Sequence, residues 1–134
     1  MAVKASVSPD VFMAALQHAR KTDAEALRSI LTGMKRPSLS EQIKWNAPSY
    51  ALDGVHFATF NFGCPKSTRL IFHCDTARKE TKGAPPAFED ETGFLEWQSN
   101  IRAIAVFRSS EAVAAAKKTL PGLVRRWVRD VVQA

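Results

Sequence analysis

The stretch Glu41-Gln42-Ile43-Lys44-Trp45-Asn46-Ala47-Pro48-Ser49-Tyr50-Ala51-Leu52 decides how this chain is expected to fold. Its first residue follows Ser38 by three positions, and this Ser-x-x-Glu spacing is a capping box that predicts a short helix. The helix must end by Trp45, because Asn46 readily adopts the left-handed conformation of a helix end and the following proline favours extended backbone before it. We therefore expect a helix that leads directly into the first strand.

Beyond this corner the period of the apolar residues changes from helical to extended. Two strands, Ser49–Leu52 and Val55–Phe62, are predicted around the turn at Asp53-Gly54. A third strand, Arg69–Cys74, follows a turn at Gly63–Ser67. These segments predict an antiparallel arrangement in the middle of the chain.

Helices are predicted towards both ends, because apolar residues recur there every three or four positions. The elements outside the central strands are a helix capped by Ser8, a helix from about Asp23 to Arg36, strands at Phe94–Gln98 and Ile101–Phe107, a helix from Ser109 or Ser110 to Lys118, and a last helix from about Leu120. Grouped strands with helices at both ends indicate an α+β fold, an antiparallel sheet of about five strands with the N-terminal and C-terminal helices packed on one face. Residues 1–134 are expected to form one domain.

Composition limits the class of protein. Hydrophobic residues make up 46% and charged residues 24% of the 134 residues, which is ordinary for a globular domain. The start lacks the apolar region of a signal peptide, and no run approaches the roughly 18 apolar residues of a membrane span. We expect a cytoplasmic protein in which Cys64 and Cys74 are free thiols, although the sequence leaves a disulfide open.

The segment Thr76–Gly93 is polar, contains three glycines or prolines between Gly83 and Pro86, and has no periodicity. A loop of this length is usually functional or disordered.

Three side chains near the predicted corner are candidates for ligand binding: Lys44, Trp45 and Tyr50. The indole would provide a stacking surface and the ammonium group an anion contact. The alternative is that Trp45 packs onto the sheet while Lys44 only lies at a helix end.

Metal binding and catalysis have weaker support. His56 and His73 are predicted on neighbouring strands, but alternation places His73 and Cys74 on opposite faces, so we expect ordinary sheet-surface histidines and no metal site. His18 is expected near the end of the first helix. Cys64 lies in a basic turn that would lower its thiol pKa, but no nucleophile–base pair is evident. An enzyme is therefore the least supported class, and the cofactor is unknown.

The net charge of +6 favours anionic partners. The spacing of three arginines, Arg125, Arg126 and Arg129, indicates the solvated face of a helix. This face would form a nucleic-acid interface only together with Lys117, Lys118 and exposed aromatic residues. A surface patch near Trp97 would allow a homodimer.

The chain resembles the YdhG-like family of small bacterial domains of unknown function. The matching residues are Glu41, Ile43, Lys44, Trp45, Pro48 and Tyr50, followed by Val55–Phe62, Arg69–His73, Ala105-Val106-Phe107 and the segment from Leu120 to Val128. Asn46 stands where members commonly have glycine. The resemblance implies the family's fold and, because some members are described as frataxin-like iron chaperones, an iron-chaperone role. Iron binding of that kind uses many carboxylates, whereas Glu89-Asp90-Glu91 is the one acidic cluster here.

Together these observations predict a noncatalytic binding or chaperone-like module that receives a small ligand or a protein partner near Lys44–Tyr50 and the long loop. The alternative is weak binding of nucleic acid or another anionic ligand through the basic helical faces. No membrane association is expected.

Overall fold

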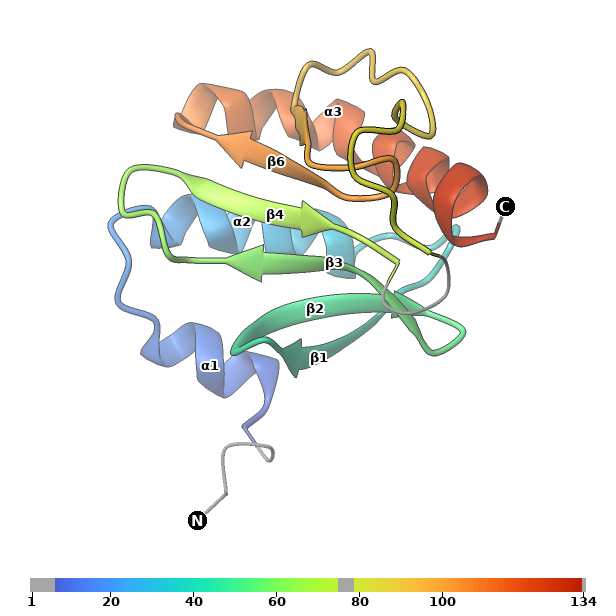
Figure 1. Cartoon of the computed structure of the whole chain (residues 1–134). Helices are drawn as coiled ribbons and strands as arrows, with labels where there is room; N and C mark the ends of the chain where they lie inside the picture. Colours follow the sequence, from blue (N-terminus) through green and yellow to red (C-terminus); the bar gives the residue numbers. More distant parts are fainter. Residues whose placement is uncertain (1–6, 75–78, 134) are drawn as a thin grey trace.

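A six-stranded antiparallel sheet forms the centre of the computed structural model, which describes residues 7–74 and 79–133 (Figure 1). Its strands are β1 (Ser40–Lys44), β2 (Ala47–Leu52), β3 (Val55–Asn61), β4 (Thr68–Phe72), β5 (Leu95–Trp97) and β6 (Ala103–Phe107), in the order β1-β2-β3-β4-β6-β5. The predicted α+β class is confirmed. The strand beyond the five predicted ones is β1, the segment before Trp45, for which the sequence predicts a helix.

The helix predicted from Ser38 to Trp45 is wrong, because residues 40–44 form β1. Lys44 pairs with Ala47 across a turn of two residues, Trp45 and Asn46, whose φ angles are 56° and 57°. Two successive left-handed residues close a tight hairpin whose twist matches its strands. The capping-box signal is therefore overridden by pairing with β2.

The pairing of β2 with β3 assigns their side chains to two faces. Ser49 lies opposite Thr59 and Tyr50 opposite Ala58, and the register then shifts so that Ala51 lies opposite His56. Because successive side chains of a strand point to opposite faces, Tyr50 points towards the helices and Ser49 points away from them.

The helices lie on one face of the sheet: α1 (Pro9–Ala15), α2 (Lys21–Thr32), α3 (Ser110–Trp127) and the π-helical turn η2 (Val128–Val132). Ser8 caps α1 as predicted, its hydroxyl accepting from Val11 N–H at 3.2 Å. The prediction of two separate C-terminal helices is wrong, because α3 continues through Pro121. No helix among the described residues is long and apolar enough to cross a membrane.

Burial of a continuous apolar stripe explains why α3 tolerates its proline. Val113, Ala116, Leu120, Val124 and Trp127 are all at most 4% exposed and face the sheet. Full burial of each large side chain stabilises the fold by roughly 1.5–3 kcal/mol, which together offsets the roughly 3 kcal/mol cost of a proline in a helix.

Aromatic side chains connect the helix layer to the sheet. Trp127 stacks on Trp97 with ring centroids 5.5 Å apart, and its Nε1–H donates to the carbonyl oxygen of His73 at 2.8 Å. Trp97 is half-buried, with part of its surface packed against the core, and the homodimer expected near it stays a prediction.

The long loop predicted at Thr76–Gly93 is described from Lys79 onward, and its first residues lie outside the described part. Phe88 is 8% exposed and packs edge-on against Trp97 and Trp127. The amide of Ala87 donates to the carbonyl of Asn100 at 2.9 Å. Residues 79–93 are thus attached to the β5–β6 hairpin by buried contacts.

Candidate functional site

The β1–β2 turn holds Trp45 over the sheet face opposite the helices. Trp45 is 51% exposed, and the centroid of its ring lies 4.5 Å from that of His73. Two cations approach the indole, Lys44 Nζ at 5.7 Å and Arg102 Cζ at 5.8 Å from the ring centroid. Each such cation–π contact contributes about 0.5–1 kcal/mol at an exposed position. The structure therefore brings the predicted pair Lys44 and Trp45 together with a third residue, Arg102.

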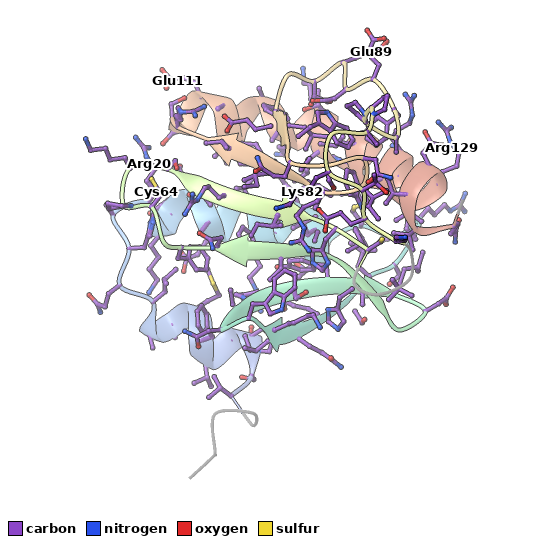
Figure 2. The ribbon with its side chains drawn as sticks, viewed as in Figure 1. Arg20, Cys64, Lys82, Glu89, Glu111 and Arg129 are labelled. Carbon is purple, nitrogen blue, oxygen red and sulfur yellow. The ribbon has the colours of Figure 1, made fainter. Side chains whose placement is uncertain are left out.

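A hollow of about 520 Å³ adjoins this turn on the same face. Its lining residues come from β4, the long loop and the β5–β6 hairpin: Ile71, Glu80, Lys82, Gln98, Arg102 and Ile104. Arg102 belongs both to this wall and to the cation pair on Trp45. Figure 2 shows Lys82 in front of the sheet, at a distance from the outer loop residue Glu89. We call Lys44, Trp45, Arg102 and this hollow the open-face site.

Cations exceed carboxylates in the open-face site. Its one carboxylate among the described lining residues, Glu80, lies 3.4 Å from Arg102, and both side chains are about one-third exposed. A hydrogen bond from Ser99 and the charge of Arg102 hold the pKa of Glu80 below its ordinary value. Exposed pairs of this kind are weak, so Arg102 can turn from Glu80 to an anionic ligand at little cost.

Beneath Trp45 runs a row of polar side chains that is buried except at His56, its half-buried end. His56 Nδ1 contacts Ser49 Oγ at 2.8 Å, Ser49 Oγ contacts Thr59 Oγ1 at 2.6 Å, and Thr59 Oγ1 contacts His73 Nε2 at 2.9 Å. Three hydrogen bonds need three protons and the two hydroxyl groups supply two, so at least one imidazole N–H donates. The row fixes the His73 ring on which Trp45 rests.

The histidines in this row differ from the expected sheet-surface histidines. His73 is 1% exposed, and its Nε2 bonds to the buried hydroxyl of Thr59. Buried imidazoles require such partners because an unpaired polar group costs roughly 1–3 kcal/mol. The expectation of two exposed histidines is therefore wrong for His73, while His56 is half-buried.

The contact between Ser49 and His56 has the composition of a nucleophile and its base. However, Ser49 is 0% exposed, and its hydroxyl also contacts Thr59. A substrate carbonyl cannot reach this oxygen without opening of the sheet. The pair is therefore structural in this conformation.

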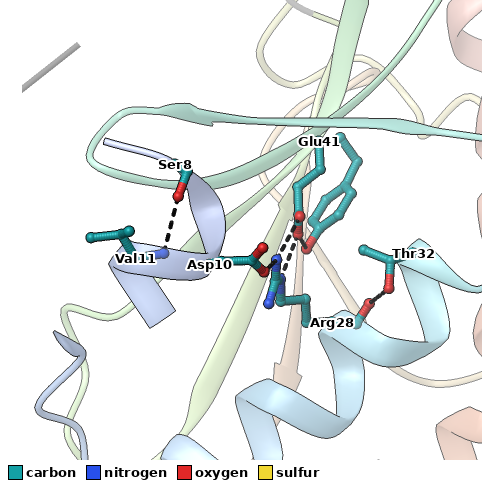
Figure 3. A network of polar contacts seen from close by, with 7 residues as sticks. Ser8, Asp10, Val11, Arg28, Thr32 and Glu41 are labelled. Carbon is teal, nitrogen blue, oxygen red and sulfur yellow. Dashed lines mark hydrogen bonds and ion pairs between the residues drawn. The ribbon is translucent and has the colours of Figure 1, made fainter. Parts of the chain in front are cut away.

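The structure separates Tyr50 from the other two candidates. Tyr50 is 0% exposed on the helix-covered face, and its hydroxyl donates to Glu41 Oε2 at 2.7 Å. Glu41 also accepts both Arg28 Nε at 2.8 Å and Arg28 Nη2 at 2.9 Å, and Arg28 reaches Asp10 at 2.7 Å (Figure 3). This network joins α1, α2, β1 and β2 on the helix-covered side of the sheet, and it runs from buried Tyr50 to exposed Asp10. We therefore leave Tyr50 out of the open-face site.

Cys64 and His18 lie at another end of the sheet, where Figure 2 shows Cys64 beside Arg20. His18 lies just beyond Leu16, the C-cap of α1. Its Nε2 donates to the Cys64 carbonyl at 2.8 Å and its Nδ1 accepts from the Arg20 amide at 2.9 Å. Hydrogen bonds from Ser67 and Lys66 lower the pKa of the half-buried Cys64 thiol. No disulfide joins Cys64 and Cys74, as expected.

Asp90, the central residue of the acidic cluster, forms hydrogen bonds within the long loop and to the start of β5. Asp90 Oδ1 accepts from the amide and hydroxyl of Thr92 at 2.9 and 2.6 Å, and Oδ2 accepts from the Leu95 amide at 3.1 Å. These bonds engage the carboxylate of Asp90, whereas Glu89 and Glu91 are exposed. Among residues 7–74 and 79–133, no group of three or more His, Cys, Asp or Glu side chains is arranged to hold a metal ion.

Comparison of the chain with protein-family models, with curated proteins and with solved structures finds no match in any of the three. The YdhG-like resemblance thus remains a prediction from the sequence.

Sequence reasoning did not find Arg102, Glu80 or Lys82. Arg102 lies between two strands that the sequence does predict, but its place beside Trp45 depends on β6 pairing with β4. No local pattern carries that information, because the two residues are far apart along the chain.

Proposed function

We propose that this protein is a noncatalytic binding module that receives a small anionic ligand with a flat apolar part at the open-face site. The observation that carries this proposal is the half-exposed indole of Trp45, approached by Lys44 and Arg102 at the edge of a hollow. An aromatic plane provides area for stacking, while the two cations favour negative charge at its edge.

The polar groups beside the indole favour binding over chemistry. The hydroxyls of Ser49 and Thr59 are fully buried, and His73 is bonded to Thr59. The groups that remain accessible are the indole, the cations and the carboxylate of Glu80, which suit recognition of a ligand; no accessible hydroxyl or thiol stands beside a base among the described residues of this site. A chaperone-like role, including the iron chaperone implied by the YdhG-like resemblance, is a narrower proposal for which the described residues offer no metal-ligand cluster.

Calorimetric titration with naphthoate tests the proposal, because this probe combines a flat ring system with one carboxylate. Naphthamide is the matched neutral probe. The variant Trp45→Asn removes the indole and keeps a residue that tolerates the left-handed backbone. Loss of the stacking contact should weaken naphthoate binding about twofold to twelvefold, the equivalent of roughly 0.5–1.5 kcal/mol.

The control is Val11→Ala, which removes the other large exposed hydrophobic side chain of the described residues, 59% exposed on α1. It should leave naphthoate binding unchanged. Equal binding of naphthoate and naphthamide would contradict the role of the cations. Equal weakening by Val11→Ala would show that binding is not located at Trp45.

Nucleic-acid binding through the basic helical faces is the alternative. Lys117, Lys118 and Arg125 are exposed on α3, but Trp45 lies across the sheet from them, so the described residues do not combine cations with an exposed aromatic platform there. Titration of a labelled oligonucleotide across a salt series decides this alternative, which requires affinity that falls steeply with salt.

A further inference from the structure

A second hollow lies between α2 and α3, on the side of the helix layer away from the sheet. It encloses about 840 Å³, and its floor is formed by small or apolar side chains: Ala26, Ile30, Val113, Ala114 and Pro121. Ala26 and Ala114 are exposed in it, whereas Val113 is 4% exposed at its base. Short side chains facing each other on two helices leave a trough that larger apolar side chains can fill. We call it the α2–α3 groove.

Four cations line the α2–α3 groove. Lys35 and Arg36 follow the end of α2, and Lys117 and Arg125 project from α3. Within the described residues none of the four forms an ion pair or a hydrogen bond through its side chain.

The carboxylate at the groove's other end is already occupied. Asp23 lies 3.0 Å from Arg20 and accepts from the Ser110 hydroxyl at 2.9 Å. The groove therefore combines an apolar floor with uncompensated positive charge.

Positive side chains gather at one end of the α2–α3 groove and carboxylates at the other. The contact between Asp23 and Ser110 joins the first turns of α2 and α3, so the two helices run in the same direction, as Figure 1 shows. Glu111 lies at the same beginning of α3 (Figure 2). Both C-terminal ends, with their partial negative charge, therefore lie at the end that carries Lys35, Arg36 and Arg125.

We propose that the α2–α3 groove binds an acidic amphipathic helix of a partner protein. The groove is an open trough, which suits a helix that buries one face and leaves the other in water. An acyl chain would remain half-exposed there. The 12 residues of α2 span about 18 Å, which matches three turns of a helix with apolar residues at spacings of three and four.

Electrostatics also set the direction of the bound helix. Carboxylates stabilise a helix in its first turn, where the partial charge is positive. Placing that end against Lys35, Arg36 and Arg125 pairs the carboxylates with the cations and faces the positive end of one dipole towards the negative ends of two others. The bound helix therefore runs antiparallel to α2 and α3.

The probe is a fluorescein-labelled peptide of about 12 residues with a leucine stripe and glutamates in its first two turns, measured by fluorescence anisotropy at low salt. The matched probe replaces each glutamate by glutamine. We expect Lys117→Glu to weaken binding of the acidic peptide about fivefold or more. Lys118→Glu is the control, because it makes the same charge change on the neighbouring exposed residue that does not line the groove.

A second pair of variants tests the floor. Ala114→Glu adds a carboxylate inside the groove and should abolish binding, whereas Ala115→Glu adds it to an exposed position outside. Circular dichroism and melting curves establish that all four variants fold. Trp45→Asn should leave peptide binding unchanged, since Trp45 lies on the other side of the sheet, so this proposal and the proposed function fail separately.

Several outcomes would overturn the proposal. They are equal effects of Lys117→Glu and Lys118→Glu, equal binding of the glutamine peptide, or no binding at low salt. Laurate binding that follows the variant pattern without any peptide binding would assign the groove to an acyl chain instead. Self-association removed by Lys117→Glu would assign it to a second copy of this chain.

Discussion

Tyr50 offers a sharp test of how the interior is organised, because it is the one tyrosine of the chain. It is fully buried, and its hydroxyl donates to Glu41 at 2.7 Å. Burial first, and then the hydrogen bond and the charge of Glu41, raise the pKa of Tyr50 far above its ordinary value of 10.0. The folded protein should therefore keep this proton at pH values at which the unfolded chain loses it.

The size of the effect follows from linkage. A group whose pKa is raised by folding contributes stability that is complete below its unfolded pKa and declines as the pH rises above that value. For Tyr50 the free energy of unfolding should fall by about 1.4 kcal/mol by pH 11 and by about 2.7 kcal/mol by pH 12. Alkaline pH acts on the rest of the protein as well, so a reference variant is needed to isolate the contribution of Tyr50.

Tyr50→Phe provides this reference because it keeps the buried ring and removes the hydroxyl. At neutral pH it should destabilise the protein by roughly 1.5–3 kcal/mol, the usual contribution of a hydrogen bond to a charged group. Above pH 10 the variant does not lose the part of the unfolding free energy that Tyr50 loses when it ionises in the unfolded chain. The stability difference between the two proteins should therefore shrink by about 1.4 kcal/mol between pH 9 and pH 11.

Urea unfolding of both proteins across this pH range measures the difference directly. Phenolate absorbance of the unmodified protein gives a second signal, which should appear only together with the loss of circular dichroism. Phenolate absorbance that rises while the protein remains folded would refute the reasoning. A stability difference that does not change with pH would refute it as well.

Three further predictions concern single positions. Iodoacetamide should modify Cys64 in the folded protein much faster than Cys74, because Cys64 is only half-buried and its thiol pKa is lowered, whereas Cys74 is 2% exposed. Mass spectrometry of timed samples measures both rates, and equal rates would contradict this. Asn46→Val should lower the free energy of unfolding by about 1–2 kcal/mol, because a branched side chain opposes a φ of 57°, while Asn46→Gly should not. Trp127→Phe should lower the free energy of unfolding by about 1–3 kcal/mol or more, because the buried His73 carbonyl loses its indole donor. Urea unfolding measures this change, and an unchanged midpoint would show that the hydrogen bond contributes nothing to stability.

The sequence predicted well the parts of the fold that depend on neighbouring residues. Ser8 caps α1, and the strand around Leu70 and Phe72 shows the alternation expected for one buried face. The hairpin at Asp53-Gly54 also forms as predicted. Each of these features is decided by contacts within a few positions along the chain.

The errors occur where distant contacts oppose a local signal. Glu41 completes a capping box with Ser38, yet in the structure its carboxylate binds Arg28 of α2 and the hydroxyl of Tyr50. Pro121 signals a helix end, yet burial of the apolar stripe against the sheet keeps α3 continuous. In both cases the tertiary contacts are stronger than a preference of about 1 to 3 kcal/mol.

The candidate site shows the same division. The sequence by itself determined that Lys44 and Trp45 lie at a tight corner, because the residues around Asn46 and the following proline restrict the backbone locally. Only the tertiary structure decided that Trp45 rests on His73 beside Arg102, and that Tyr50 points into the interior. The reason is that a side chain's partners depend on which strands pair and in which register, and a one-residue change of register exchanges the two faces of a strand.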